Sequence, residues 1–394
     1  MHRFARPTAI GLAGFCSFLN LYAPQPLLPM IRDRFGADAV SAGHMISATT
    51  LAVALIAPFT GVVADHLGRK RVIATAMFAL IVPTLMVAFS DSLGAMVFWR
   101  FVQGLLLPPI FVVTVAYIGD ELPMDQATTM AGIYTSACCF GGFFGRFMSG
   151  LLAAQFGLRG AFIGLAVLSL IAAIGFTALL PRETRFVPSG GILPSLRHMR
   201  DHLLNPRLTA IFAVGFGVLF SFVGTFNYIA FYLAGPPFGL SAAAIGTIFV
   251  VWLIGVVTTP ATGFFVRRIG RRALVLIGMV FWAAGLLVTL SSNLALIVAG
   301  LALAAGCGFF CQAASTAYVA VSAERARSSA VGLYVTFYYL GGSVGAVLPG
   351  YAWNRFGWPG CVAVLVAMVG IMGVMVARFW RESHRLSGKP GLAD

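Results

Sequence analysis

Long apolar runs, separated by short polar stretches, extend over almost the whole chain. About 20 helical residues are needed to cross ~30 Å of hydrocarbon, and each run comes close to that length or exceeds it. The pattern therefore predicts an all-α membrane protein with little chain left for a soluble domain. We count twelve transmembrane helices, at about residues 9–30, 42–64, 72–90, 93–118, 128–154, 160–180, 208–234, 242–266, 273–291, 294–320, 328–352 and 358–380.

The distribution of charge supports this prediction and gives an orientation. Of the 394 residues, 59% are hydrophobic and only 10% charged, whereas a soluble domain carries about 25% charged residues. In a soluble protein a net charge of +14 would suggest nucleic-acid binding, but here 20 of the 26 Lys and Arg residues fall on the same side of the predicted spans, the termini included. Such a bias marks the cytoplasmic side. We therefore expect both termini in the cytoplasm and no nucleic-acid partner.

The chain offers no residue set for metal, cofactor or enzyme chemistry. Cys307 and Cys311 share a helical face, but no His or carboxylate lies at their depth to complete a zinc site. The sequence also lacks a nucleophile with a neighbouring base and a phosphate-binding loop. We expect no cofactor, no metal and no enzymatic activity, and we interpret the cysteines as small packing residues.

A weak internal repeat divides the chain into halves. Residues 141–145 (GGFFG) return as 341–345 (GGSVG), and Phe156-Gly157 returns as Phe356-Gly357, both at an offset of 200. The repeat predicts two pseudo-symmetric six-helix bundles related by an axis along the membrane normal. The predicted domains are an N-terminal bundle at residues 1–180, a polar and basic cytoplasmic linker at 181–207, and a C-terminal bundle with a short cytoplasmic tail at 208–394.

A glycine, an aspartate and a basic cluster follow at fixed spacing between the second and third spans, as Gly61, Asp65 and Gly68-Arg69-Lys70. This segment resembles the signature loop of the major facilitator superfamily. With the spans and the repeat, the resemblance covers roughly residues 8–380. It implies a membrane transporter with this loop as part of a cytoplasmic gate. The residues expected in the gate are Gly61, Asp65, Gly68, Arg69, Arg71 and Glu121.

The gate also makes physical sense. Unpaired N–H groups at a helix N-terminus favour an anion, so we expect Asp65 near Ser328 and Ser329 at the start of the eleventh span. The alternative is that the loop charges serve topology and form solvated pairs worth under ~1 kcal/mol each. The basic residues are expected to meet the acidic cluster of the same side, Asp120, Glu121 and Asp125.

Two further motifs indicate a branch of the superfamily. Arg100-Phe-Val-Gln103-Gly104 is similar to a segment of drug/proton antiporters, and the resemblance implies an inward-facing arginine. Residues 141–150 are similar to the antiporter motif of that group, except that Arg146 replaces a proline and Ser149 a glycine. These segments, with 22–29 (YAPQPLLP) and 336–343 (TFYYLGGS), resemble YnfM-like and arabinose-efflux-permease-like bacterial transporters. That resemblance implies a multi-pass protein of the bacterial inner membrane and favours efflux.

Arg100 and Arg146 are the only charges deep inside predicted spans, and no acidic residue shares their depth. Each lies ~7 or 8 residues, or ~11 Å, from the outer surface. A charge at membrane depth usually faces a partner or a watery pathway, so we expect them to bind an anionic substrate. The alternative is a structural tie to backbone carbonyls, for which glycine-rich span 5 makes Arg146 the better candidate. The other expected substrate-binding residues are Gln25, Gln103, Asn227, Asn20 and Tyr22.

The coupling ion is less visible, because all twelve acidic residues fall in loops or at span ends. Asp33 and His44 are the candidates for proton coupling, although an interfacial role for His44 is an alternative. Exchange of one anion for another fits the same residues.

We therefore predict a monomeric secondary active transporter that moves a small organic anion or amphipathic metabolite through the bilayer by alternating access, in the direction of efflux. The alternatives are a multidrug/proton antiporter of cationic or neutral compounds, an organic anion uptake symporter, and a receptor or enzyme built on a transporter fold. Buried carboxylates, which would suit cationic drugs, are missing from the spans.

Overall fold

The computed structural model describes residues 2–181, 201–323 and 327–380, and every regular element within these ranges is a helix. The first half contains α1 (His2–Leu21), η1 (Gln25–Leu27), α2 (Leu28–Phe35), α3 (Ala39–Leu67), α4 (Arg69–Ala88), α5 (Leu93–Leu106), α6 (Pro108–Glu121) and α7 (Met124–Leu179). The second half contains α9 (Pro206–Ala234), α10 (Ala242–Ile248), η2 (Phe249–Leu253), α11 (Ile254–Ile269), α12 (Arg271–Val288), α13 (Leu294–Ser322), α14 (Arg327–Gly345) and α15 (Leu348–Phe379).

Nine helical segments of the described ranges are long and apolar enough to cross a membrane. Two of them, Gln126–Leu179 and Ser329–Phe379, contain 54 and 51 residues, about twice the length of one crossing. Each reverses at a glycine with left-handed φ, 70° at Gly157 and 62° at Gly357, a conformation that glycine adopts without strain. Counted as two crossings each, and with α1 added, they give the twelve crossings, so the predicted fold class is confirmed.

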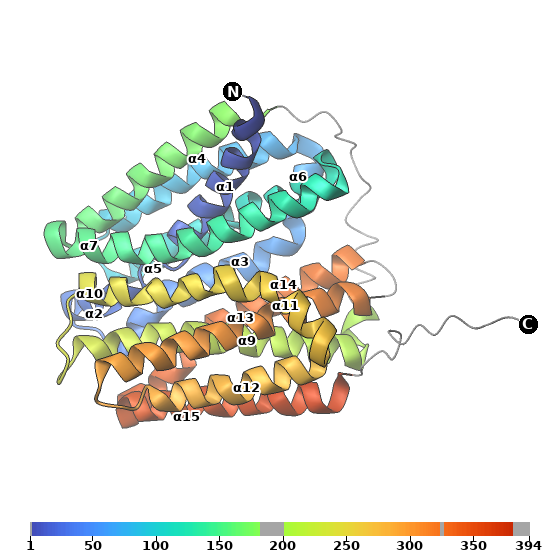
Figure 1. The fold of residues 1–394 in the computed structure, drawn as a ribbon. Helices are drawn as coiled ribbons and strands as arrows, with labels where there is room; N and C mark the ends of the chain where they lie inside the picture. The colour runs from blue at the N-terminus through green and yellow to red at the C-terminus, as the bar shows by residue number, and fades with distance from the viewer. Residues whose placement is uncertain (1, 182–200, 324–326, 381–394) are drawn as a thin grey trace, which may run out of the picture.

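The helices form two bundles, α1–α7 and α9–α15 (Figure 1). The internal repeat is visible in their packing. A Cβ atom at Gly145 of α7 would collide with the carbonyl oxygen of Leu19 in α1, and one at Gly345 of α14 with that of Phe220 in α9. Each bundle therefore uses the same glycine to bring two backbones together. The domain boundaries predicted from the sequence remain predictions, since residues 182–200 and 381–394 lie outside the described ranges.

The bundles meet at one end and diverge at the other. We call the end with the turns at Gly68 and Gly270, each followed by arginine, the basic side, and the end with the turns at Gly36 and Gly239 the far side. In Figure 1 the far side is at the left, where α7 and α10 lie together. The basic side is at the right, where α7 and α11 separate.

Hydrogen bonds join the bundles along the far half of the molecule. Asn354 Nδ2 donates to Asp38 Oδ2 at 2.9 Å at the far-side surface. Deeper, the hydroxyls of Ser47 and Ser343 lie 2.8 Å apart. The structure therefore shows the far side closed by contacts between the bundles.

Candidate functional site

The first crossing is interrupted where the candidate site lies. α1 ends at Leu21, and Pro24 and Pro26 cannot donate backbone hydrogen bonds, so the helix resumes only through the short η1. The interruption places Gln25, 1% exposed, at the interface between the bundles. It also leaves backbone carbonyls without helical donors inside a membrane protein, where each must find another partner.

Arg100 supplies most of these partners. Its Nη1 donates to the Asn20 carbonyl at 3.0 Å and its Nη2 to the Leu21 carbonyl at 2.7 Å. Its Nε donates to the Met45 carbonyl of α3 at 3.0 Å, and Nη1 also donates to Gln103 Oε1 at 2.6 Å. With 1% of its surface exposed, Arg100 joins α1, α3 and α5 inside the first bundle. This geometry matches the structural alternative for an intramembrane arginine.

Gln103 and Asn20 belong to the same buried cluster. Gln103 Nε2 donates to the Thr84 hydroxyl at 2.7 Å, and Asn20 Nδ2 donates to the Ser169 hydroxyl at 2.8 Å. The cluster thus links α1, α4, α5 and α7. The substrate-binding role predicted for Arg100, Gln103 and Asn20 remains a prediction.

Arg146 lies at the interface between the bundles. Its Nε donates to Gln25 Oε1 at 2.6 Å and its Nη1 to the Gly142 carbonyl at 2.5 Å, while Nη2 makes no hydrogen bond within the described ranges. Its guanidinium carbon lies 4.9, 5.0 and 4.4 Å from the ring centroids of Tyr22, Phe249 and Trp252. Arg146 is 1% exposed and no carboxylate of the described side chains pairs with it. It is therefore a buried cation held by aromatic rings and amide oxygens.

The local helix geometry of the eighth crossing explains the aromatic contacts. η2 is a 3₁₀ helix, in which side chains at positions i and i+3 eclipse. Phe249 and Trp252 therefore point in the same direction, toward Arg146. A Cβ atom at Gly246 would lie 2.8 Å from the Arg146 carbonyl oxygen, so only glycine lets α10 approach α7 this closely.

A relay of polar side chains crosses from one bundle to the other. Gln25 accepts from Arg146 and donates from Nε2 to Asn227 Oδ1 at 2.8 Å. Asn227 is fully buried in α9, and its Nδ2 has no hydrogen-bond partner in the described part of the chain. A donor left unpaired in an apolar interior costs about 1–3 kcal/mol. The relay therefore carries one positive charge and an unused donor but no acid.

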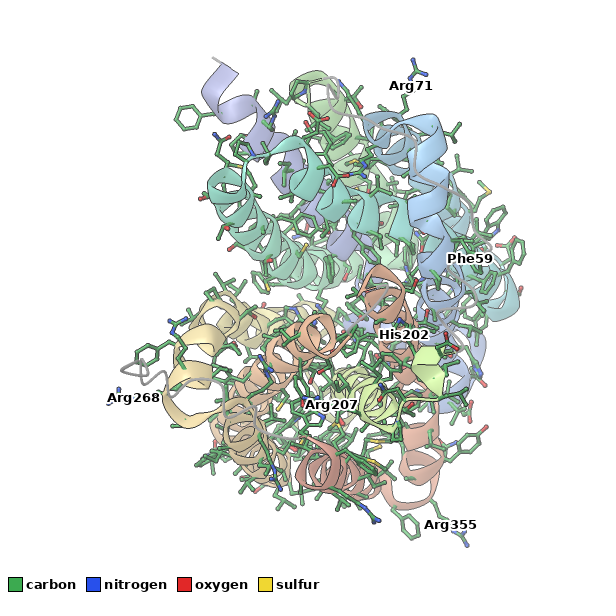
Figure 2. All side chains as sticks on the ribbon, turned by 90° about the vertical axis from the view of Figure 1, so that its right-hand side faces the viewer. Phe59, Arg71, His202, Arg207, Arg268 and Arg355 are labelled. Atoms are coloured by element: carbon green, nitrogen blue, oxygen red, sulfur yellow. The ribbon has the colours of Figure 1, made fainter. Side chains whose placement is uncertain are left out.

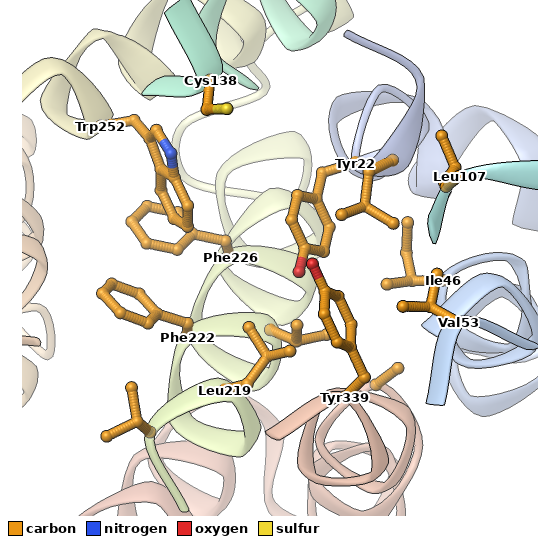
Figure 3. Packing of buried hydrophobic residues seen from close by; sticks show 14 of the residues in the cluster. Tyr22, Ile46, Val53, Leu107, Cys138, Leu219, Phe222, Phe226, Trp252 and Tyr339 are labelled. Atoms are coloured by element: carbon orange, nitrogen blue, oxygen red, sulfur yellow. The ribbon is translucent and has the colours of Figure 1, made fainter. Parts of the chain in front are cut away.

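The tyrosine whose ring contacts Arg146 faces a second tyrosine. In Figure 3 the hydroxyls of Tyr22, from the first bundle, and Tyr339, from α14, point toward one another. The Tyr339 ring also approaches Phe111, with centroids 5.8 Å apart. Phe222, Phe226 and Trp252 pack beside them, with centroid distances of 5.1 Å from Trp252 to each phenylalanine. The site is thus mostly aromatic, with few polar groups, as small-molecule sites usually are.

Sequence reasoning missed Phe249, Trp252 and Tyr339 as members of the site. Isolated aromatic residues inside spans are commonplace in this chain, which has 34 Phe. The 3₁₀ segment that turns Phe249 and Trp252 to one side has no sequence signal apart from the i, i+3 spacing itself. Tyr339 lies within the segment 336–343 that supported the family resemblance.

The predicted gate is described only in part. Arg69 forms an ion pair with Asp120 within the first bundle, Glu121 is buried, and Arg71 is exposed (Figure 2). Gly68 has φ of 87° between α3 and α4. The structure does not describe the side chains of Asp65, Asp125 and Ser328, and for Gly61 it describes only the helix to which it belongs. The contacts of these four residues in the gate remain predictions.

The predicted proton-coupling residues lie away from the relay. Asp33 pairs with the adjacent Arg32 at 2.7 Å and is 65% exposed, and His44 is exposed on α3. Neither contacts Arg146 in the hydrogen bonds and ion pairs of the described side chains. Their coupling role remains a prediction.

Twelve helical crossings in two bundles, with a buried polar relay between them, are the architecture of a membrane transporter, and comparison with known proteins identifies the family. The model of the Major Facilitator Superfamily matches residues 10–257 and 233–394. This chain belongs to that superfamily. It is not an enzyme but a transporter.

Individual relatives agree with this assignment. The chain is 32% identical to the inner membrane transport protein YnfM of Escherichia coli (strain K12), over 97% of this chain and 92% of the relative. It is also 32% identical to the uncharacterized MFS-type transporter YybF of Bacillus subtilis (strain 168), over 96% and 93%. Its fold resembles a crystal structure of the nucleoside transporter NupG (D323A mutant) with a TM-score of 0.80, at 16% identity over 95% and 100% of the two chains. The predicted family and the predicted likeness to YnfM are thus confirmed.

Proposed function

We propose that this transporter moves a small organic anion or amphipathic metabolite by alternating access, with Arg146 as the group that recognises the anion. One observation carries the proposal. Arg146 is buried between the bundles without an acidic partner among the described side chains, and its Nη2 edge has no hydrogen bond. A charge at membrane depth is costly and is retained on substrate pathways. A carboxylate or phosphate would supply the missing partner.

The neighbours of Arg146 support an amphipathic ligand. Asn227 Nδ2 is a second unused donor, linked to Arg146 through Gln25. Tyr22, Phe249 and Trp252 provide apolar area around the charge. An anion with an apolar or aromatic body would pair its oxygens with the two donors and lay its body against the rings.

The same contacts suggest how binding couples to movement. Arg146 belongs to the first bundle, whereas Phe249, Trp252 and Asn227 belong to the second, so opening of the far side must break their contacts. A ligand that competes for the guanidinium shifts the equilibrium between closed and open states by its differential affinity for them. Ligand binding at Arg146 thereby changes the side of the membrane to which the site is open.

The sequence supports a proposed direction of transport and a proposed orientation in the membrane. The concentration of Lys and Arg on the basic side supports a cytoplasmic location for this side and for both termini, in a bacterial inner membrane. The resemblance to efflux transporters supports export. Protons, through Asp33 or His44, are the candidate coupling ion, and an uptake symporter for the same anions would use the same site.

A second candidate substrate class is cationic. Three aromatic rings within 5.0 Å of a cation form the arrangement that recognises ammonium groups, and here Arg146 occupies it. A cationic substrate would need to displace Arg146 from the rings. This requirement makes it the alternative and not the main proposal.

Ligand-induced thermal stabilisation separates these classes. The purified full chain in detergent is screened against organic anions and cations matched in size and ring content. The proposal predicts stabilisation by anions, with apparent affinity falling as salt rises. Stabilisation by cations alone would replace the proposal with the alternative.

A further inference from the structure

Two arginines of the second bundle converge on one tyrosine at the basic side, away from the candidate substrate site. Tyr318 lies near the end of α13 and is 3% exposed. Arg207, in the first turn of α9, donates from Nε and Nη2 to the Tyr318 hydroxyl at 3.0 and 2.7 Å. The guanidinium carbon of Arg271, the first residue of α12, lies 4.8 Å from the centroid of the same ring. Two positive groups are therefore held beside one ring.

Among the described residues, no carboxylate pairs with either arginine. Neither Arg207 nor Arg271 forms an ion pair with a residue of the described ranges, although Asp201 precedes Arg207 closely in sequence. Arg207 is exposed and Arg271 half-buried, so the two positive charges repel each other with part of the repulsion screened by water. The arrangement favours a partner of negative charge.

Two buried donors of residues that contact the Tyr318 ring lack acceptors among the described residues. Arg271 Nε and Trp380 Nε1 are buried and have no hydrogen-bond partner in the part of the chain that the structure describes. Trp380 is 2% exposed and packs on Tyr318, with ring centroids 4.7 Å apart. Indole and guanidinium groups can only donate, and buried donors are normally paired. The missing partner therefore offers acceptor oxygens as well as negative charge.

We propose that Arg207, Arg271, Tyr318 and Trp380 form a binding site for a phosphate group at the membrane surface of the basic side. The planar fork of arginine matches the geometry of phosphate oxygens. α9 and α12 both begin here, and helix N-termini favour anions. In Figure 2, Arg207 lies toward the middle of the second bundle, whereas Arg268 projects from its edge.

Two sources can supply the phosphate. Anionic phospholipids of the adjacent leaflet carry it at the depth where the basic ends of helices meet the headgroups. Soluble phosphate and its esters offer the same chemistry from the aqueous side. The site recognises the group that both share.

The test uses the purified full chain in phosphatidylcholine-containing micelles and follows the thermal unfolding midpoint as phosphatidylglycerol or inorganic phosphate is added. The site variant Arg207→Gln/Arg271→Gln is compared with Arg267→Gln/Arg268→Gln, which removes the same charge from exposed positions of the same side. The site arginines are proposed to make charge-assisted hydrogen bonds to the phosphate, which the exposed control arginines do not make. Each such bond contributes about tenfold in affinity, so the site variant should need about 100-fold more ligand than wild type. The control variant should respond as wild type does.

Comparison of the two probes, phosphatidylglycerol and inorganic phosphate, identifies the source of the phosphate group. If the phosphate belongs to a lipid headgroup, phosphatidylglycerol should stabilise the protein and inorganic phosphate should not. If it belongs to a soluble ester, inorganic phosphate should stabilise the protein without anionic lipid. Either pattern, lost in the site variant, supports the site. The proposal is overturned if the site and control variants respond alike to both probes. Trp380→Phe keeps both arginines and an aromatic ring, and it should weaken the response severalfold; a wild-type response would contradict the site as described.

Discussion

Gln25 and Asn227 stand 202 positions apart in the two halves of the chain and hydrogen-bond to each other at 2.8 Å across the bundle interface. Leu19 and Phe220, which contact the equivalent glycines of the two bundles, precede Gln25 by six residues and Asn227 by seven. The two amides therefore occupy nearly equivalent places in the repeats and can meet only near the axis that relates them. The relay from Arg146 through Gln25 to Asn227 therefore lies close to that axis. A ligand bound there touches both bundles, which is the position that alternating access requires.

Arg100 is predicted to act on stability more than on ligand binding. Arg100→Ala would leave the carbonyls of Asn20 and Leu21 without donors, while the Met45 carbonyl would keep the Thr49 hydroxyl. Each orphaned buried acceptor costs about 1–3 kcal/mol, so we expect a loss of roughly 3–5 kcal/mol and a clearly lower thermal midpoint. Affinity for the transported anion in the surviving folded protein should be close to that of wild type.

Arg159→Ala is the control for Arg100, since Arg159 is an exposed arginine at the far side. Its midpoint should equal that of wild type. The structural role of Arg100 would be wrong if the two variants unfolded alike and only the Arg100 variant lost affinity.

Trp252 is predicted to hold the far side closed. Trp252→Ala removes the ring whose centroid lies 4.4 Å from the Arg146 guanidinium carbon. A desolvated cation–π contact is worth about 2 kcal/mol, so the ratio of closed to open far side should fall about 30-fold. Pulsed electron-electron distances between spin labels at Arg34 and Thr247, exposed residues of the two bundles, should lengthen.

Trp252→Phe provides the matched control, because phenylalanine keeps an aromatic face in the same position. Its distance distribution should lie between those of wild type and Trp252→Ala. A distribution for Trp252→Ala that coincides with the wild type would show that the contact does not stabilise closure.

Asp38 is predicted to stabilise the far side with a simple dependence on pH. Hydrogen bonds from Ser41, and with them one from Asn354, lower the pKa of Asp38 below its usual value. Because the folded-state pKa is lowered, the contribution is present above the unfolded value of about 3.9 and is lost as pH falls through the folded-state value. The stability difference between wild type and Asp38→Ala should thus be constant from about pH 8 to pH 5 and shrink below about pH 4.

Asp38→Asn separates the cap from the charge, since Asn also caps helix N-termini but does not titrate. Its stability relative to Asp38→Ala should not change over the acidic range. A wild-type contribution that varied between pH 5 and pH 8 would assign the effect to another group.

Much of the fold was predictable because it rests on patterns that the membrane enforces. Spans must be long and apolar, and the repeat preserved the glycines at Gly145 and Gly345 that bring backbones into contact. Gln25, Asn227 and Arg146 were also expected together as substrate-binding residues, and the structure brings them into one chain of hydrogen bonds.

The different surroundings of Arg100 and Arg146 were not predictable in this way. The glycines around Arg146 made a tie to backbone carbonyls more plausible for that residue. It does donate to the Gly142 carbonyl of its own helix, but Arg100 ties three carbonyls of neighbouring segments. The deciding feature is the interruption after Leu21, whose free carbonyls face α5. Pro24 and Pro26 predict that the helix is interrupted, but tertiary packing determines which helix lies opposite the interruption.

The most direct test of the account is the affinity of wild type, Arg146→Lys and Arg146→Gln for an organic anion that stabilises the wild type. Isothermal titration of monodisperse protein at low and high salt measures it. The account predicts binding about 10- to 100-fold weaker for Arg146→Lys, which keeps the charge but not the planar fork, and still weaker, salt-independent binding for Arg146→Gln. Wild-type affinity in folded Arg146→Gln would contradict the assignment of anion recognition to this arginine.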